Sequence, residues 1–182
     1  RQNSLEPPRR PHNKGTVQTM IEILTTGGTI DKVYFDANSK FEIGDSLLPE
    51  LLTESNIHDG YEVRPLMRKD SLELTDADRQ TILAAVKASA SQRILITHGT
   101  DTMAQTAEVL KSVADRTIVL TGAMQPARMR RSDATFNVGF AWAAVSLLPA
   151  GVYIAMNGEV FEQKMDLFVL LILDLLLLER IT

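Results

Sequence analysis

Short apolar runs alternate with longer amphipathic stretches through the middle of this chain, and that alternation constrains its fold more than any other feature. The runs lie at Met20–Leu24, Tyr61–Met67, Arg93–Thr97, Thr117–Leu120 and Val152–Met156. Strands that alternate with helices pair in parallel, and the helices pack on the faces of the sheet. We therefore predict an α/β fold: a flavodoxin-like, doubly wound and mostly parallel sheet in three layers, with helices on both faces.

Three of the amphipathic stretches are expected to form helices. The first begins at a capping box in Thr75–Asp78 and runs through Ala90, and the second spans Thr102–Ala114. The third spans Ala134–Leu148, with Asp133 as its N-cap. The side chains expected to face inward from the first two helices are Ile82, Leu83, Val86, Met103, Ala107, Leu110 and Val113.

Composition excludes several classes of protein. At 182 residues, with 45% hydrophobic and 23% charged residues, the chain has the size and composition of one globular domain. Its net charge of −4 gives no broad basic field, so we expect no nucleic acid as a principal partner. It has no cysteine, and none of its three histidines form a pair with helical ligand spacing, so no metal is expected. We also expect no cofactor.

The N-terminal residues differ in composition from the domain that follows. Residues 1–19 are basic and proline-rich with almost no apolar residues, which is typical of a disordered tail or of a segment foreign to the domain. They lack the apolar region of a secretion signal, and nothing requires an oxidising compartment, so we expect a cytoplasmic protein. We expect the domain to span residues 20–162 and to end in a hairpin, turned by Asn157–Gly158 before the strand Glu159–Phe161.

The C-terminal residues, 163–182, form an atypical apolar tail. Its run Leu167–Leu178 is too short to cross a bilayer and contains Asp174, so we expect no membrane association. A buried segment and an exposed, adhesive one are equal alternatives for this tail.

Two strings of hydroxyl and glycine residues follow apolar runs, where an open α/β sheet builds its binding crevice. Thr25–Ile30 (TTGGTI) follows the first run, and His98–Thr102 (HGTDT) follows the third. Within the first string, Thr29 is a candidate nucleophile, provided that a base removes its proton. The alternatives are a glycine-rich turn whose hydroxyls satisfy the backbone, or an anion-binding loop.

The second string contains polar groups of three kinds. The carboxylate of Asp101 suits an ammonium group, and the Thr100 hydroxyl suits proton handling or the positioning of water. An N-cap at Asp101 or Thr102, with Gln105 completing a box, is the structural alternative and explains only part of the string. His98 is a structural hydrogen-bonding residue as readily as a catalyst.

These strings, in this order, resemble the asparaginase/glutaminase family of amidohydrolases. The resemblance runs from about Ile21 to Val160 and covers the N-terminal domain of that family. It implies that Thr29 attacks the side-chain amide carbonyl to give an acyl-enzyme and ammonia. By the same resemblance, Thr100 is the second catalytic threonine, and Asp101 holds the ammonium group of the substrate.

Two further segments resemble the family's substrate-binding loops. Asp70–Thr75 (DSLELT) resembles the segment whose serine binds the substrate α-carboxylate, which gives Ser71 that role. Thr121–Pro126 (TGAMQP) resembles the loop whose alanine backbone meets the scissile amide, which gives Ala123 that role. Gly28 and Glu73 complete the set of expected substrate-binding residues.

The chain departs from the family pattern in three places. Phe41 stands where the family carries a loop tyrosine, although Tyr34 lies closer to Thr29 in the sequence. Phe168 stands where the family carries the lysine that serves as base for the second threonine, so the nearby Lys164 is the base that we assign. The family's C-terminal domain, which contributes to the site across a subunit interface, has no counterpart.

The resemblance implies hydrolysis of L-asparagine, or of L-glutamine, by a homo-oligomeric enzyme that acts on a small amino acid. Three alternatives stay open: a catalytically impaired amino-acid-binding or regulatory homologue, an amidotransferase subunit, and a gene fragment. A nucleotide or phosphate binder that uses Thr25–Thr29 as its anion loop is a fourth, although the chain lacks the glycine pattern and lysine of the usual phosphate loops.

Overall fold

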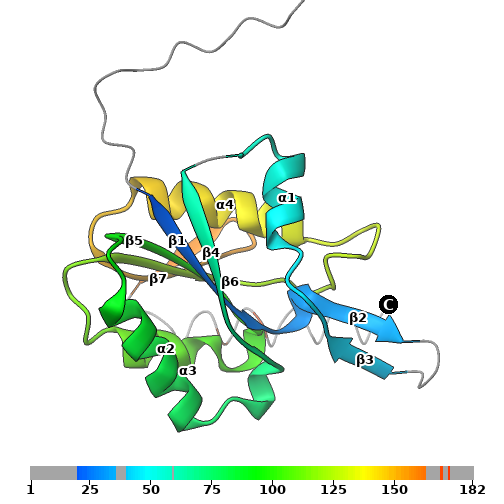
Figure 1. The fold of residues 1–182 in the computed structure, drawn as a ribbon, viewed down its shortest axis with the longest axis horizontal. Helices are drawn as coiled ribbons and strands as arrows, with labels where there is room; N and C mark the ends of the chain where they lie inside the picture. Colours follow the sequence, from blue (N-terminus) through cyan, green and yellow to red (C-terminus); the bar gives the residue numbers. More distant parts are fainter. Residues whose placement is uncertain (1–19, 36–39, 59, 163–168, 170–171, 173–182) are drawn as a thin grey trace, which may run out of the picture.

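The computed structural model describes residues 20–35, 40–58 and 60–162, together with residues 169 and 172. Among these residues the main sheet has six strands in the order β4–β1–β5–β6–β7–β8, and β8 alone runs antiparallel to its neighbour (Figure 1). The strands are β1 (Ile21–Gly27), β4 (Tyr61–Lys69), β5 (Arg93–Thr97), β6 (Thr117–Thr121), β7 (Gly151–Met156) and β8 (Glu159–Phe161). The direction of travel across the sheet reverses at β1, as in flavodoxin-like folds. The predicted fold class is confirmed.

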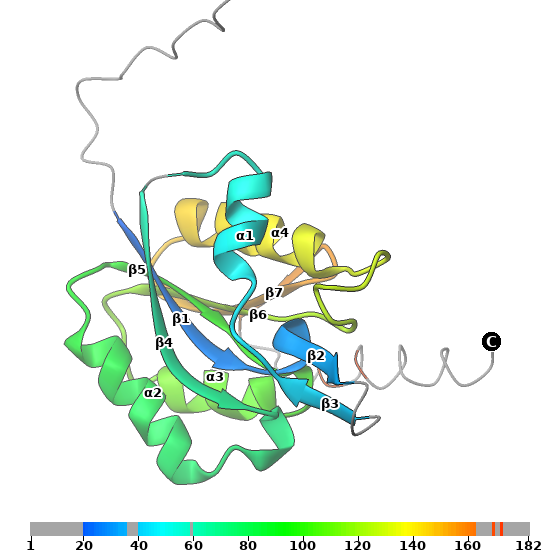
Figure 2. The ribbon, with the colours of Figure 1, turned by 45° about the vertical axis from the view of Figure 1, so that its right-hand side comes forward.

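Different helices cover the two faces of the sheet: α1 (Leu48–Glu54), α2 (Asp76–Ala88), α3 (Met103–Leu110) and α4 (Ala134–Leu147). Side chains alternate between faces along each strand, so successive residues of one strand pack against different helices. In β5, Ile94 and Ile96 lie in the apolar core that contains the helices α2 and α3, whereas Leu95 lies in the core that contains α1 and α4 (Figure 2). All seven side chains predicted to face inward from the first two expected helices are buried.

The structure also contains elements that the apolar pattern did not predict. An antiparallel pair, β2 (Lys32–Phe35) and β3 (Lys40–Ile43), projects from the carboxyl edge of the sheet, and the helix α1 follows it (Figure 1). Both α2 and α3 end earlier than expected, at Ala88 and Leu110. The predicted hairpin between β7 and β8 is present.

The C-terminal expectations fall largely outside the described residues. Ile172 is helical and buried in the same core as α2 and α3, whereas Val169 is exposed. The boundaries that we expected around the domain 20–162 are not tested by the structure and stay predictions. Within the part of the chain that is described, no helix is both long enough and apolar enough to cross a membrane.

Candidate active site

Four parallel strands end at the same edge of the sheet, and each leads into one of the predicted site segments. Strand β1 leads through Gly28 into the 3₁₀ turn η1 (Thr29–Asp31), and β4 leads into the 3₁₀ turn η2 (Ser71–Glu73). Strand β5 leads into the 3₁₀ turn η3 (Thr100–Thr102), and the loop with Ala123 follows β6. Because β1 and β5 are neighbours at the switch point of the sheet, this edge is where such folds bind ligands.

The backbones of three site segments are in direct contact. Gly28 has φ 87° and ψ −173°, a conformation that is essentially restricted to glycine. A side chain at Gly28 would overlap the backbone of Gly99, and a side chain at Gly99 would overlap Ser71. The absence of side chains at these two positions therefore brings the turns of Thr29, Thr100 and Ser71 together.

Hydrogen bonds join Ser71 to the HGTDT segment. The Ser71 hydroxyl donates to Asp101 Oδ2 at 3.1 Å, and the Thr102 hydroxyl donates to the backbone oxygen of Ser71 at 2.8 Å. The alternative that Thr102 and Gln105 form an N-terminal box is wrong, because Thr102 makes no capping bond and Gln105 accepts from Arg79 instead. The structure therefore brings together two of the predicted substrate-binding groups.

The two candidate catalytic threonines differ in accessibility. Thr29 is half-buried at the start of η1, and its hydroxyl makes no hydrogen bond within the described part of the chain. Thr100 is buried at the start of η3, with 8% of its surface exposed. Thr26, which precedes the glycine pair, anchors β1 to β5 by donating its hydroxyl to the Thr97 oxygen at 2.8 Å.

His98 is a structural residue beneath the site. Its ring is fully buried, with Nδ1 2.7 Å from the Gly99 oxygen and Nε2 2.8 Å from the Thr106 hydroxyl. Burial lowers the pKa of His98 to about 4, so the ring is neutral at physiological pH. A neutral ring with these neighbours donates from Nδ1 and accepts at Nε2, which fixes the backbone just before Thr100.

The carboxylate of Asp133 fixes the loop after β6. The Asp133 carboxylate accepts hydrogen bonds from the backbone nitrogens of Met124 and Gln125 at 2.9–3.1 Å, and from the Asn137 side chain at 2.8 Å. Asp133 is the N-cap residue of α4, as predicted, but its side chain makes no capping bond, because the carboxylate is turned toward the loop. These bonds fix the backbone next to Ala123, which is itself buried.

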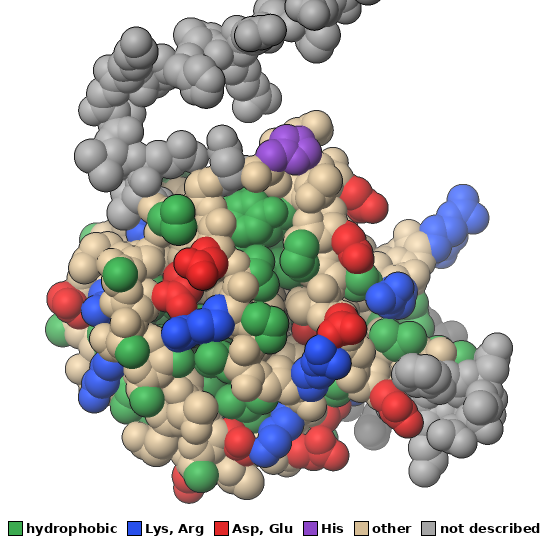
Figure 3. All heavy atoms as spheres, in the orientation of Figure 1, with side chains coloured by type: hydrophobic (Ala, Val, Ile, Leu, Met, Phe, Trp, Pro, Cys, Tyr) green, Lys and Arg blue, Asp and Glu red, His purple; other side chains and the backbone are tan. Residues whose placement is uncertain are grey.

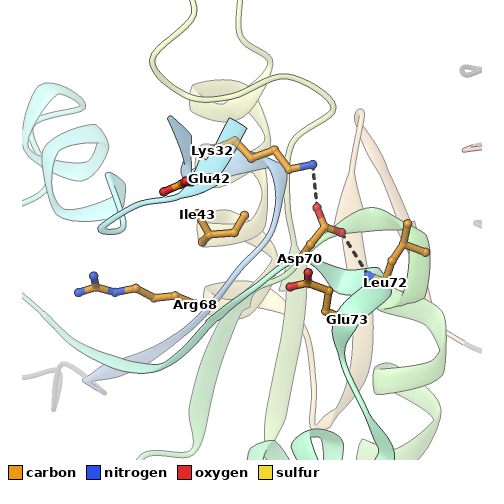
Figure 4. A pocket seen from close by; sticks show the side chains of 7 residues that line it. All are labelled: Lys32, Glu42, Ile43, Arg68, Asp70, Leu72 and Glu73. Atoms are coloured by element: carbon orange, nitrogen blue, oxygen red, sulfur yellow. Dashed lines mark hydrogen bonds and ion pairs between the residues drawn. The ribbon is translucent and has the colours of Figure 1, made fainter. Parts of the chain in front are cut away.

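An open cleft of about 500 Å³ adjoins this edge, between the β2–β3 pair and the end of β4 (Figure 4). Glu73 lines the cleft and is exposed, and Ser71, its neighbour in η2, is buried on the side of Gly99. The other lining residues are Lys32, Glu42, Ile43, Arg68, Asp70 and Leu72. The sequence reasoning assigned no role to Lys32 or Asp70, because two charges far apart in the sequence carry no visible pairing signal.

Two of the expected departures can be located only in part. The backbone of Phe41 lies opposite Tyr34 in the β2–β3 pair. Lys164, our assigned base, and Phe168 lie outside the described residues. No cluster of three or more potential metal ligands occurs among the residues that the structure describes. On the face shown in Figure 3, acidic and basic side chains are interspersed, without a broad basic area.

Comparison with known proteins gives a consistent result. The sequence profile of the family described as "Asparaginase, N-terminal" matches residues 20–165. A protein named as a subunit of glutamyl-tRNA(Gln) amidotransferase, from Methanococcus vannielii, is 31% identical over 148 residues, covering 77% of this chain and 34% of that protein. A protein named probable L-asparaginase periplasmic, from Haemophilus influenzae, is 32% identical over 159 residues, covering 79% of this chain and 44% of that protein.

Solved structures show the same similarity. The thermostable L-asparaginase from Thermococcus kodakarensis matches with a TM-score of 0.68 at 29% identity, covering 79% of this chain and 45% of that one. The chain thus spans between 34% and 45% of the length of these three proteins.

Proposed function

Because the chain belongs to the asparaginase family, we propose that it hydrolyses the side-chain amide of L-asparagine to ammonia and the acidic amino acid. L-Glutamine is the second candidate substrate. The observation that carries the proposal is the direct contact among the turns of Thr29, Ser71 and Thr100, through Gly28 and Gly99. Asparaginases among the similar proteins support the choice of substrate.

In the proposed reaction Thr29 is the nucleophile. Its hydroxyl oxygen bonds to the amide carbon, the carbon–nitrogen bond breaks, and the nitrogen leaves as ammonia with the proton that Thr29 loses. The resulting ester is hydrolysed by water, which releases the carboxylic acid and returns a proton to Thr29. The backbone at Ala123, held by Asp133, supplies fixed dipoles close to the amide carbonyl.

Substrate binding replaces a contact within the protein. Ser71 and Asp101 are hydrogen-bonded to each other at 3.1 Å. We propose that the substrate inserts here, with its ammonium group on Asp101 and its α-carboxylate on Ser71. Gly28 and Glu73 complete the binding residues, Gly28 because its backbone can approach the ligand closely.

Thr100 is proposed as the second catalytic threonine, which handles the proton or positions the hydrolytic water. We keep Lys164 as the candidate base for Thr100.

The direct test is ammonia release from L-asparagine and L-glutamine, with three variants. Thr29→Ala is expected to release no ammonia, because it removes the attacking oxygen, while Thr29→Ser retains that oxygen and part of the activity. Thr81→Ala, an exposed threonine on α2, is the matched control and should behave like the unchanged protein. Unchanged turnover in Thr29→Ala would exclude Thr29 as the nucleophile.

A second candidate function is amino-acid binding without turnover, either as a regulatory homologue or as part of an amidotransferase. The Thr29 hydroxyl has no basic partner within the described residues, which favours this candidate, and one relative is named as part of an amidotransferase. Calorimetric binding of L-asparagine by folded protein that releases no ammonia would support it. Thr29-dependent turnover would exclude it.

We propose a homo-oligomer in the cytoplasm. With no cysteine, the chain has no disulfide that would need an oxidising compartment, whereas the name of the Haemophilus influenzae relative places that protein in the periplasm. Fractionation of the native host would test the cytoplasmic location, and light scattering of the purified protein would test the homo-oligomeric state.

A further inference from the structure

An ion pair crosses the cleft between the β2–β3 pair and the end of β4. Lys32 Nζ lies 2.7 Å from Asp70 Oδ2, and Figure 4 shows the lysine side chain reaching across toward that carboxylate. Both side chains are about three-quarters buried, at 28% and 26% exposed. Another ion pair at this cleft, between Arg68 and Asp45, is far more exposed. Since solvent screens exposed pairs most, the Lys32–Asp70 pair is the stronger of the two.

Each partner of this ion pair is hydrogen-bonded to the 3₁₀ turn that contains a residue with a proposed role. The backbone nitrogen of Lys32 donates to the Thr29 oxygen, which closes η1. On the other side, Asp70 precedes Ser71 and caps η2: its Oδ1 accepts from the Leu72 nitrogen at 3.2 Å. A displacement of the Lys32–Asp70 pair is therefore passed to Thr29 on one side and to Ser71 on the other.

The charge on Asp70 persists at neutral pH. Burial alone would raise the pKa of Asp70, but the hydrogen bonds from Lys32 and from the Leu72 nitrogen outweigh it and hold the pKa below its ordinary value. The carboxylate therefore stays ionised and can hold both turns at once.

We propose that Lys32 is a positioning residue, whose ion pair with Asp70 sets the position of the Thr29 turn relative to the Ser71 turn. This inference rests on the proposed function. A substrate held at Ser71 and Asp101 presents its amide carbon to Thr29 only when the two turns have the correct separation. Lys32 is not a catalytic residue, because its charge is engaged by Asp70 and not by the substrate.

The kinetic test separates positioning from binding. In Lys32→Met, kcat is expected to fall by about 10- to 100-fold, since a misplacement of about 1 Å has an effect of this size. KM should stay within about threefold, because the side chains of Ser71 and Asp101 are untouched. Lys32→Arg restores the charge and should recover most of kcat. Unchanged kcat in Lys32→Met, or a rise in KM alone, would overturn the proposal.

A double-mutant cycle tests whether the two partners act together. Asp70→Asn keeps an acceptor for the Leu72 nitrogen but loses the charge, so it should match Lys32→Met in kcat. The double variant should be no slower than either single variant. Multiplied losses of kcat would mean that Lys32 and Asp70 act independently, which overturns the proposal.

Amide hydrogen exchange tests the positioning role of Lys32 without depending on turnover. In Lys32→Met, the Lys32 and Leu72 amides should exchange at least several-fold faster than in the unchanged protein. Lys111→Met, which breaks an exposed ion pair with Glu108 at the C-terminal end of α3, should leave both amides unchanged. If the protein releases no ammonia but these amides respond, the proposed function fails and the positioning role stands. If both amides keep their exchange rates in Lys32→Met, the positioning role fails whatever the activity.

Discussion

At the scale of single residues, the site depends on one backbone position that tolerates no side chain. Gly28 adopts a conformation essentially restricted to glycine, and an added Cβ would overlap the backbone of Gly99. Backbone strain of this kind costs about 1–3 kcal/mol, and the overlap with Gly99 adds to it. We therefore expect Gly28→Ala to lower the free energy of unfolding by at least about 2 kcal/mol in urea titrations, and to abolish ammonia release.

Gly139→Ala is the matched control for this residue-scale prediction. Gly139 is exposed within α4, and an added Cβ would meet nothing within 4 Å. Alanine favours a helix over glycine by about 1 kcal/mol, so this change should raise the free energy of unfolding. A Gly28→Ala protein as stable as the unchanged one would contradict the contact between the two turns.

At the scale of elements, the start of α2 is set by a reciprocal cap. The Thr75 hydroxyl accepts from the Asp78 nitrogen at 3.2 Å, and the Asp78 carboxylate accepts from the Thr75 nitrogen at 2.8 Å. We expect Thr75→Ala to lower the free energy of unfolding by about 1 kcal/mol, because the first turn loses its acceptor. Thr81→Ala, an exposed change within the same helix, should raise it by a few tenths. Equal effects of the two variants would rule out a special role for the cap.

The same helix and its neighbours show which elements the sequence predicts. The cap at Thr75–Asp78 was predictable because both of its partners lie within four residues of each other. The fold class was predictable because apolar strands and amphipathic helices recur along the chain. The β2–β3 pair was not predicted, since each of its strands has only four residues and the apolar ones are too few to stand out as a run. Asp133 was predicted correctly as the N-cap residue of α4, but the partners of its carboxylate were not. Met124 and Gln125 lie in another segment, and only folding brings their backbone nitrogens to the carboxylate.

At the scale of the whole molecule, two buried groups give stability opposite dependences on pH. Burial raises the pKa of Asp31 from 3.8 to about 6, so the folded state binds more protons than the unfolded state between those values. The protonated Asp31 side chain therefore contributes to the free energy of unfolding below pH 3.8, and this contribution is lost as the pH rises to about 6. For His98 burial lowers the pKa from 6.5 to about 4, so its contribution is present above pH 6.5 and is lost as the pH falls to about 4.

The two contributions overlap between about pH 4 and pH 6, and each amounts to about 3 kcal/mol. We therefore expect them to cancel largely in the unchanged protein. Asp31→Asn should leave a free energy of unfolding that rises with pH across this window, and His98→Asn should leave one that falls. The Asp31→Asn/His98→Asn double variant gives the baseline pH dependence of the free energy of unfolding, which is due to the other titratable groups. Urea titrations at a series of pH values measure the four slopes. Two single variants that both follow the baseline would show that neither group titrates with a shifted pKa in the folded protein.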